Sequence, residues 1–329
     1  MSTFVRTIGI GLLWSLIAMQ AAAQPSPDAA ATFPNRPVKL IVPFPPGGPT
    51  DLMARVFGQK LSEQWGQPVV IENRAGGNSA IGAQQTAKSA PDGYTLLVAM
   101  DTTLVMNPIT TRNLPYDALK DFAPISLTAQ NTSLLIVRAD GPKTVQELIS
   151  KAKANPGKLN YGAGIITTRL AGYLFSRLAD IETVFIPYKG SSEVVQGLLT
   201  GSIDFSIDGV SASIPLIKEG KLRALAKLNN RPLPALPDLA PLSVVANLPE
   251  LGEISTWAGL VAPADTPPSI VDKIQRAVAK VAADPEVSAK LQNFGIVAVS
   301  TTPSEFDRYY RGELDRWSKV FKDSGIKLD

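Results

Sequence analysis

The 329-residue sequence contains neither cysteine nor histidine. The chain can therefore form no disulfide, and it lacks the thiolate and imidazole ligands on which zinc sites depend. The same absences exclude Ser-His-Asp and Cys-His nucleophile systems. Because histidine is the one side chain whose unperturbed pKa lies between pH 5 and 8, we expect the net charge to be nearly constant across that range. The exception would be a carboxylate or a lysine whose pKa is shifted by burial.

A charge imbalance and the common enzyme motifs are also missing. Lysine and arginine total 32 against 29 aspartates and glutamates, and no basic run stands out, so we expect no nucleic-acid partner. Neither a GxGxxG, a GxxxxGK[ST] nor a GxSxG motif occurs, and no calcium-binding loop is present. We therefore expect no catalytic residue, no cofactor and no metal site.

The N-terminus has the features of an export signal. Arg6 precedes an apolar run from Ile8 to Met19, and Ala21-Ala22-Ala23 supplies the small residues that signal peptidase reads. The alternative is an uncleaved membrane anchor, but about a dozen residues are short for ~30 Å of hydrocarbon. The pattern predicts a signal peptide over residues 1–23 and a periplasmic mature protein that begins at Gln24. The remainder is long enough for two domains of about 150 residues.

The rest of the sequence alternates between strand-like and helix-like patterns. Helical spacing of apolar residues recurs in 53–61, 145–152, 270–281 and 306–321, and a Thr144/Glu147 capping box begins the second of these. The alternation predicts an α/β fold of two lobes, each with a parallel, doubly wound sheet. The expected strands are 38–44, 69–72, 95–100, 134–138, 184–188, 204–208, 222–228 and 296–300.

The most informative segment is Pro43-Phe44-Pro45-Pro46-Gly47-Gly48-Pro49-Thr50-Asp51, between the first strand and the first helix. Its glycines let backbone N–H groups approach a ligand, and a helix N-terminus attracts anions. Thr50 could contact a ligand or cap the helix, and Asp51 could simply complement the helix dipole. A purely structural turn explains the segment equally well.

Other strand-to-helix junctions carry hydroxyl and acidic groups. Thr167 and Thr168 follow Gly164, although both threonines could be ordinary helix caps. Arg169 would offer a permanent cation to a carboxylate, or would point to solvent. Thr102, Ser191 and Asp208 lie at three further strand ends, and the Asp208-Gly209 pair could be a simple turn. Trp257 is expected to line a cleft or to lie in the core.

A series of motifs runs in order along most of the chain. They are Phe33-Pro34-Asn35-Arg36-Pro37-Val38, the 43–51 loop, Val70-Ile71-Glu72-Asn73-Arg74, residues 87–97 (AKSAPDGYTLL), Asn107-Pro108, Leu114-Pro115-Tyr116-Asp117, residues 120–124 (KDFAP), Pro187-Tyr188-Lys189-Gly190 and residues 220–226 (GKLRALA). With these motifs the chain resembles the periplasmic solute-binding receptors of tripartite tricarboxylate transporters, the Bug receptors.

The resemblance implies a type II periplasmic binding protein, or Venus flytrap, fold. Lobe 1 would comprise residues 33–126 and 246–329, and lobe 2 residues 127–245. The implied function is capture of a small organic carboxylate between the lobes and its delivery to the membrane subunits of the transporter, by a monomer that is not an enzyme. Two alternatives are a receptor that presents its closed form to a membrane histidine kinase, and a periplasmic hydrolase on a similar scaffold.

The resemblance also implies site residues on both lobes. At the second lobe the sequence departs from the family pattern, because the loop before Thr167 is about two residues short and Arg169 stands where a histidine is expected. The strand ends add Thr102, Gly164 and Arg169 to the residues carried over. The complete expected site is Gly47, Gly48, Thr50, Asp51, Asn78, Ser79, Thr102, Gly164, Thr167, Thr168, Arg169, Ser191 and Asp208.

Overall fold

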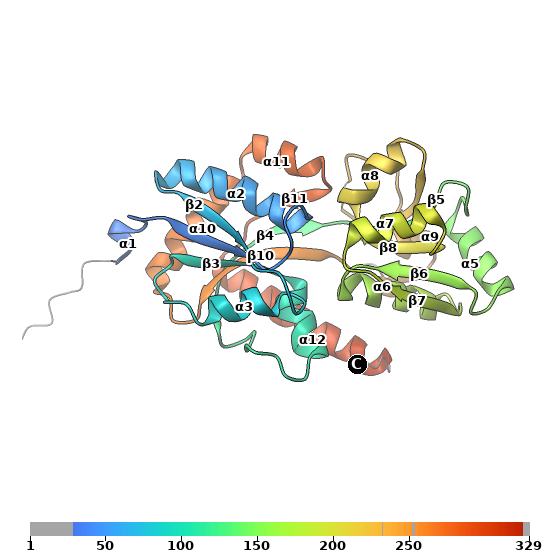
Figure 1. Cartoon of the computed structure of the whole chain (residues 1–329), viewed down its shortest axis with the longest axis horizontal. Coiled ribbons are helices and arrows are strands. Elements are labelled where there is room, and N and C mark those ends of the chain that lie inside the picture. The colour runs from blue at the N-terminus through green and yellow to red at the C-terminus, as the bar shows by residue number, and fades with distance from the viewer. Residues whose placement is uncertain (1–28, 232, 252–253, 325–329) are drawn as a thin grey trace, which may run out of the picture.

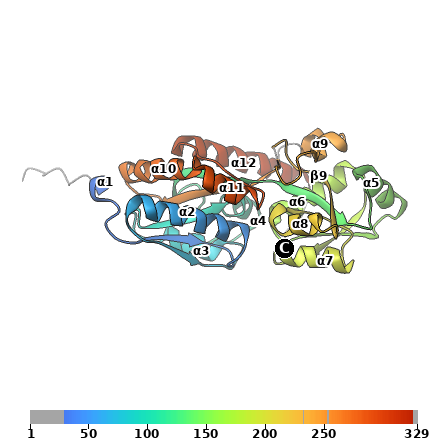
Figure 2. The same ribbon diagram turned by 90° about the horizontal axis from the view of Figure 1, so that it is seen from above.

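The computed structural model of the chain describes residues 29–231, 233–251 and 254–324. The expected signal peptide at 1–23 lies outside these residues. Figure 1 shows two α/β lobes side by side, each built on its own sheet, and Figure 2 shows the same two lobes from above. No helix in the described ranges has both the length and the apolar character needed to cross a membrane.

Lobe 1 is built on a six-stranded sheet with the order β11-β4-β10-β3-β1-β2. Strand β1 runs parallel to β2 and β3, whereas β10 is antiparallel to β3 and β4, and β11 is antiparallel to β4. The strands are β1 Val38–Val42, β2 Val69–Asn73, β3 Thr95–Met100, β4 Phe122–Asn131, β10 Thr256–Pro263 and β11 Ile296–Ala298.

Helices cover both faces of this sheet. Apolar residues of α2, α10 and α11 form one buried cluster against it, and those of α3 and α12 belong to a cluster on the other face. The elements of this part of the chain are α1 Ala29–Thr32, α2 Pro49–Trp65, α3 Ala80–Ala87, the π-helix η1 Thr102–Met106, α4 Asn107–Thr110, α10 Pro268–Ala282, α11 Pro285–Gln292 and α12 Pro303–Ser324.

Lobe 2 is built on a five-stranded sheet with the order β7-β6-β8-β5-β9. Its strands are β5 Ser133–Arg138, β6 Leu159–Ala163, β7 Thr183–Pro187, β8 Phe205–Gly209 and β9 Leu222–Lys227. Its helices are α5 Val145–Ala154, α6 Ile166–Leu178, α7 Ser191–Thr200 and α8 Val210–Lys218, and two short helices, α9 Leu242–Val245 and η2 Pro249–Leu251, follow β9. Strand β5 is antiparallel to both β8 and β9.

The predicted elements are present, with one error of strand direction. Strands form at all eight expected segments, and the Thr144 hydroxyl accepts the hydrogen bond from Glu147 N that the capping box predicts. The expectation of parallel sheets is wrong, because β4, β5, β10 and β11 run antiparallel to their neighbours. The missed strands β4, β6 and β10 contain proline, alanine or glycine residues, which dilute the β-branched pattern on which the prediction depended.

The chain passes between the lobes at Thr132, since β4 belongs to the first sheet through Asn131 and β5 begins the second at Ser133. The expected boundary after residue 126 therefore falls inside β4. The chain returns between β9 and β10. On the α12 side, one buried apolar cluster continues from lobe 1 into lobe 2 and includes Trp257, Leu135 and Phe175, whereas the cores on the opposite sheet faces are separate.

Candidate functional site

The junction between the lobes brings together loops from both sheets. Asp101 directly follows β3 of lobe 1, and Thr167 lies in the first turn of α6 of lobe 2. The Thr167 hydroxyl donates a hydrogen bond to Asp101 Oδ2 at 2.5 Å, and both side chains are buried. The candidate residues of the two lobes are therefore in direct contact across the junction.

The 43–51 loop of lobe 1 is held by Asp51. This carboxylate is only 3% exposed and accepts hydrogen bonds from Gly47 N (3.0 Å), Arg55 Nε (2.9 Å) and Asn73 Nδ2 (3.0 Å). Burial raises the pKa of Asp51, but the hydrogen bonds from Arg55, Gly47 and Asn73 outweigh burial and lower it. Gly47 has φ of +85°, a conformation that favours glycine. Asp51 thus fixes the loop rather than leaving its oxygens open to a ligand.

Gly48 and Thr50 begin α2. Gly48 is the N-cap residue, and its carbonyl accepts from Leu52 N at 3.0 Å. The Thr50 hydroxyl makes no helix cap; it is buried and donates to Met100 Sδ at 2.9 Å. The first N–H groups of a helix have no acceptor within the helix, so the start of α2 supplies donors and a partial positive charge.

Asn78 and Ser79 form the next part of lobe 1, in left-handed backbone conformations with φ of 51° and 77°. Ser79 Oγ accepts from Thr103 Oγ1 at 2.9 Å and from Asn107 Nδ2 at 3.3 Å. Asn107 Nδ2 also donates to the carbonyl of Asn78 at 2.6 Å. Ser79 is therefore committed to contacts within lobe 1, while the Asn78 side chain is exposed.

The lobe 2 residues lie at the starts of α6 and α7. Gly164 is required by packing, because a Cβ there would lie 2.6 Å from the backbone of Gly190. The Thr168 hydroxyl donates to the carbonyl of Ile165 at 3.1 Å. The Ser191 hydroxyl donates to Asp208 Oδ1 at 3.0 Å, and Asp208 is buried.

Arg169 does not join the other candidates. Its guanidinium lies over the ring of Phe185, 4.5 Å from the centroid, and it lines a cavity of about 450 Å³ formed only by residues of lobe 2. The physical reason is helix geometry: residues two positions apart on a helix point about 200° apart, so Thr167 and Arg169 cannot face the same side. Trp257, the other ambiguous residue, is fully buried in the core against Phe306 and Tyr309.

Several side-chain atoms at the junction are buried with no hydrogen-bond partner among the described residues. They include Asp101 Oδ1, Thr102 Oγ1 and Asp208 Oδ2 and, beside the Thr132 passage, Asn131 Oδ1 and Asn229 Nδ2. Buried polar atoms are nearly always paired, so atoms of this kind point to water or a ligand as the partner. They mark the junction as the candidate binding site.

Burial also changes the expected titration. It raises the pKa of Asp101 to about 7, against the opposing effect of the Thr167 hydrogen bond, and it raises the pKa of Asp208 to about 6. The exception to constant charge that the sequence left open therefore applies, since burial places the pKa values of both carboxyls between pH 5 and 8. Sequence reasoning missed Asp101 as a site residue. The available signal was an acidic residue directly after an apolar strand, at the strand end where ligands bind.

Comparison with known proteins agrees with this architecture. The family model described as "Tripartite tricarboxylate transporter family receptor" matches residues 53–326. The curated relative Protein BugT of Bordetella pertussis is 35% identical over 315 residues, which cover 92% of this chain and 94% of BugT.

Three solved structures share the fold. Rpa4515 of R. palustris, solved with adipate, has a TM-score of 0.83 and 34% identity over 90% of this chain and 99% of its own. The periplasmic binding protein BugD has a TM-score of 0.80 and 28% identity over 90% and 99%. MatC of Rhodopseudomonas palustris, with bound malate, has a TM-score of 0.77 and 30% identity over 88% and 99%.

Proposed function

This chain belongs to the tripartite tricarboxylate transporter receptor family, and we propose that it captures a small organic carboxylate between its lobes and delivers it to the membrane subunits of such a transporter. The family is one of solute-binding receptors, not of enzymes. Bound adipate and malate in two neighbours of the same fold support a carboxylate as the ligand.

The observation that carries the proposal is the contact between Thr167 and Asp101. It joins a strand end of lobe 1 to a helix start of lobe 2, beside buried polar atoms that have no partner among the described residues. A ligand enclosed there would touch both lobes at once, and closure of lobes around ligand is the usual switch of such receptors.

Neutral donors would hold the carboxylate. The proposed set comprises the amides at the starts of α2 and α6 and the hydroxyl of Thr102, while Arg169 contributes no charge because it packs on Phe185. Helix N-termini attract anions through their free N–H groups and partial positive charge. The Gly47-Gly48 backbone, which Asp51 holds in place, completes the part of the proposed site that lobe 1 forms.

The proposal includes a location and a division of the chain. Residues 1–23 would direct export to the periplasm and be removed before Gln24, and the mature protein would act as a monomer. We place the passages between the lobes at Thr132 and in the segment between β9 and β10. N-terminal mass spectrometry of the periplasmic protein would give a peptide that begins at Gln24; retention of residues 1–23 would reject the cleavage.

A thermal-shift screen of mono- and dicarboxylates tests the proposed function. A ligand at 100 times its Kd should stabilise the protein by about 2.7 kcal/mol. Solution scattering at saturation should then show a smaller radius of gyration than without ligand. If no carboxylate in the screen stabilises the protein, the proposed function is wrong.

A further inference from the structure

Asp101, like Asp208, has one buried oxygen without a hydrogen-bond partner among the described residues, and of the two only Asp101 bonds to a side chain of the other lobe. Asp101 is 2% exposed; its Oδ2 accepts from Thr167 Oγ1, and its Oδ1 is the buried oxygen without a partner among the described residues. The backbone N–H groups of Asp101 and Thr102 lie near the carboxylate and favour its charged form, without making a hydrogen bond of normal geometry to Oδ1.

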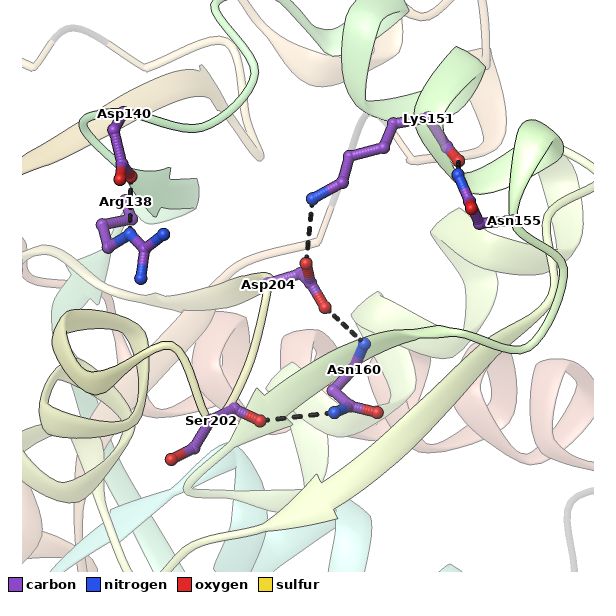
Figure 3. A network of polar contacts seen from close by, with 7 residues as sticks. All are labelled: Arg138, Asp140, Lys151, Asn155, Asn160, Ser202 and Asp204. Carbon is purple, nitrogen blue, oxygen red and sulfur yellow. Dashed lines mark hydrogen bonds and ion pairs between the residues drawn. The ribbon is translucent and has the colours of Figure 1, made fainter.

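Comparable carboxylates elsewhere are fully paired. Asp51, which is equally buried, accepts three hydrogen bonds that involve both of its oxygens. Figure 3 shows Asp204, at the start of β8, between Lys151 Nζ (3.0 Å to Oδ1) and Asn160 N (3.0 Å to Oδ2). Asp51 and Asp204 are thus fully paired, whereas, among the described residues, Oδ1 of Asp101 and Oδ2 of Asp208 have no partner at the lobe junction.

We propose that Asp101 determines ligand specificity: the captured acid carries a hydroxyl or ammonium group beside its carboxylate, and Asp101 Oδ1 accepts a hydrogen bond from that group. This inference rests on the proposed function of the same site. While Asp101 is charged, an ionised carboxylate offers it only acceptors, so a simple diacid would leave Oδ1 unpaired and would face another negative oxygen. A site built to pair with a donor strongly rejects the analogue that lacks it.

The groups around Asp101 leave the demand for a donor with Asp101 itself. Glu313 of α12 acts on Asp101 through its charge, but it is paired with Arg316 at 2.9 Å. From α6, Thr167 contributes a neutral hydroxyl that is already bonded to Oδ2. Between the ligands of the two neighbours, malate has a donor hydroxyl and adipate has none.

Calorimetry with matched acids, at a pH above 7 where Asp101 is charged, tests the inference on the mature chain. Succinate, malate and aspartate share a four-carbon skeleton and differ in one hydrogen, hydroxyl or ammonium group; adipate and 2-aminoadipate repeat the comparison at six carbons. We expect the donor-bearing member of at least one set to bind ten or more times tighter than its plain diacid. In Asp101→Asn, whose amide can present a donor instead, that preference should shrink to within threefold.

Two variants serve as controls, and three outcomes are informative. Asp204→Asn, on the outer network of lobe 2, should keep the preference of the wild type. Thr167→Val leaves Asp101 Oδ1 in place, so this variant should also prefer the donor-bearing acid, although it should bind every acid more weakly.

Equal affinity within each wild-type set, or an unchanged preference in Asp101→Asn, overturns the role of Asp101 but leaves carboxylate capture intact. If Asp101→Asn does not fold, the wild-type sets alone decide. If none of the acids binds, the proposed function fails as well.

Discussion

The two lobes contribute to the junction in different ways. In lobe 1 the 43–51 loop is fixed by contacts within its own lobe, because Asp51 ties Gly47, Arg55 and Asn73 together. In lobe 2 the first turn of α6 has no such internal anchor at Thr167, whose hydroxyl instead bonds to Asp101 of the other lobe. Lobe 1 therefore presents a preformed surface, whereas the lobe 2 surface is completed only when the lobes meet.

The opposite sides of the junction differ as well. On the α12 side the buried apolar contacts continue from one lobe to the other. On the side of α8 and α11 the cores are separate, and the lobes touch through Val210 and Gly295. Figure 1 shows α8 beside β11 on this side. When the lobes open, the α8 side should therefore separate more easily than the α12 side, because less apolar contact is lost there.

The largest effect is expected from Asp51→Ala, which removes the internal anchor of lobe 1. Three donors lose a buried acceptor, so the free energy of unfolding should fall by about 3 kcal/mol and binding should weaken with it. Urea unfolding measures the loss. Asp204→Ala, in a more exposed network, should lose about 1 kcal/mol or less; equal losses in the two variants would contradict the special role of Asp51.

The pH dependence of stability should be a property of the junction. Burial raises the folded-state pKa of Asp101 to about 7 and of Asp208 to about 6, whereas both values are near 4 in the unfolded chain. The folded state therefore gains stability from holding these two protons. This gain is complete below the unfolded pKa and is lost as pH rises through the folded values. The free energy of unfolding without ligand should therefore fall between pH 4 and 7. The slope should be shallower in Asp101→Asn, and an identical slope in both proteins would argue against this origin.

Thr167→Val tests the lobe 2 half directly. It removes the hydrogen bond to Asp101 while nearly preserving shape, so ligand affinity should fall by about 1.5–3 kcal/mol, the range for a bond to a charged group. Calorimetry measures the affinity. Thr168→Val is the matched control, because the Thr168 hydroxyl bonds only within its own turn. A larger loss of affinity in the control would place the critical hydroxyl at Thr168.

Gly295→Ala should obstruct closure on the α8 side. A Cβ at Gly295 would lie 1.6 Å from Val210 Cγ2, so affinity should fall about tenfold, which corresponds to about 1.4 kcal/mol. Gly66→Ala carries the same strain of a positive φ but has open space around the added carbon, and should bind normally. Val210→Ala in the Gly295→Ala background should restore part of the affinity; no recovery would mean that strain, not obstruction, is responsible.

The smallest effect is expected from Arg169→Ala. Because its guanidinium packs on Phe185 within lobe 2, the change should alter ligand affinity by less than threefold, or about 0.6 kcal/mol. The melting temperature should fall slightly through the lost cation–π contact. Calorimetry showing a tenfold or greater loss of affinity would return Arg169 to the binding site.

Much of the fold could be predicted from local pattern. The strand at 95–100 has the predicted bounds, and the last helix contains the predicted segment 306–321. Strand direction could not be predicted in this way, because β10 pairs antiparallel with β3, some 160 residues earlier, and no local signal records such a partner. The same limit applies to Arg169, whose helical position was evident but whose partner Phe185 was not.

Local sequence was enough to identify the family and most of the strands and helices, and it predicted an export signal and the loops at which a ligand would bind. Local propensity, capping residues and glycine-rich turns act over a few residues and are written in the chain. Which of those loops face each other depends on tertiary packing, because burial and contact between lobes arise only when distant segments pack together. In the folded chain Thr167 bonds to Asp101, and Asp51 bonds within its own lobe. Burial also raises the pKa values of Asp101 and Asp208 to near neutrality.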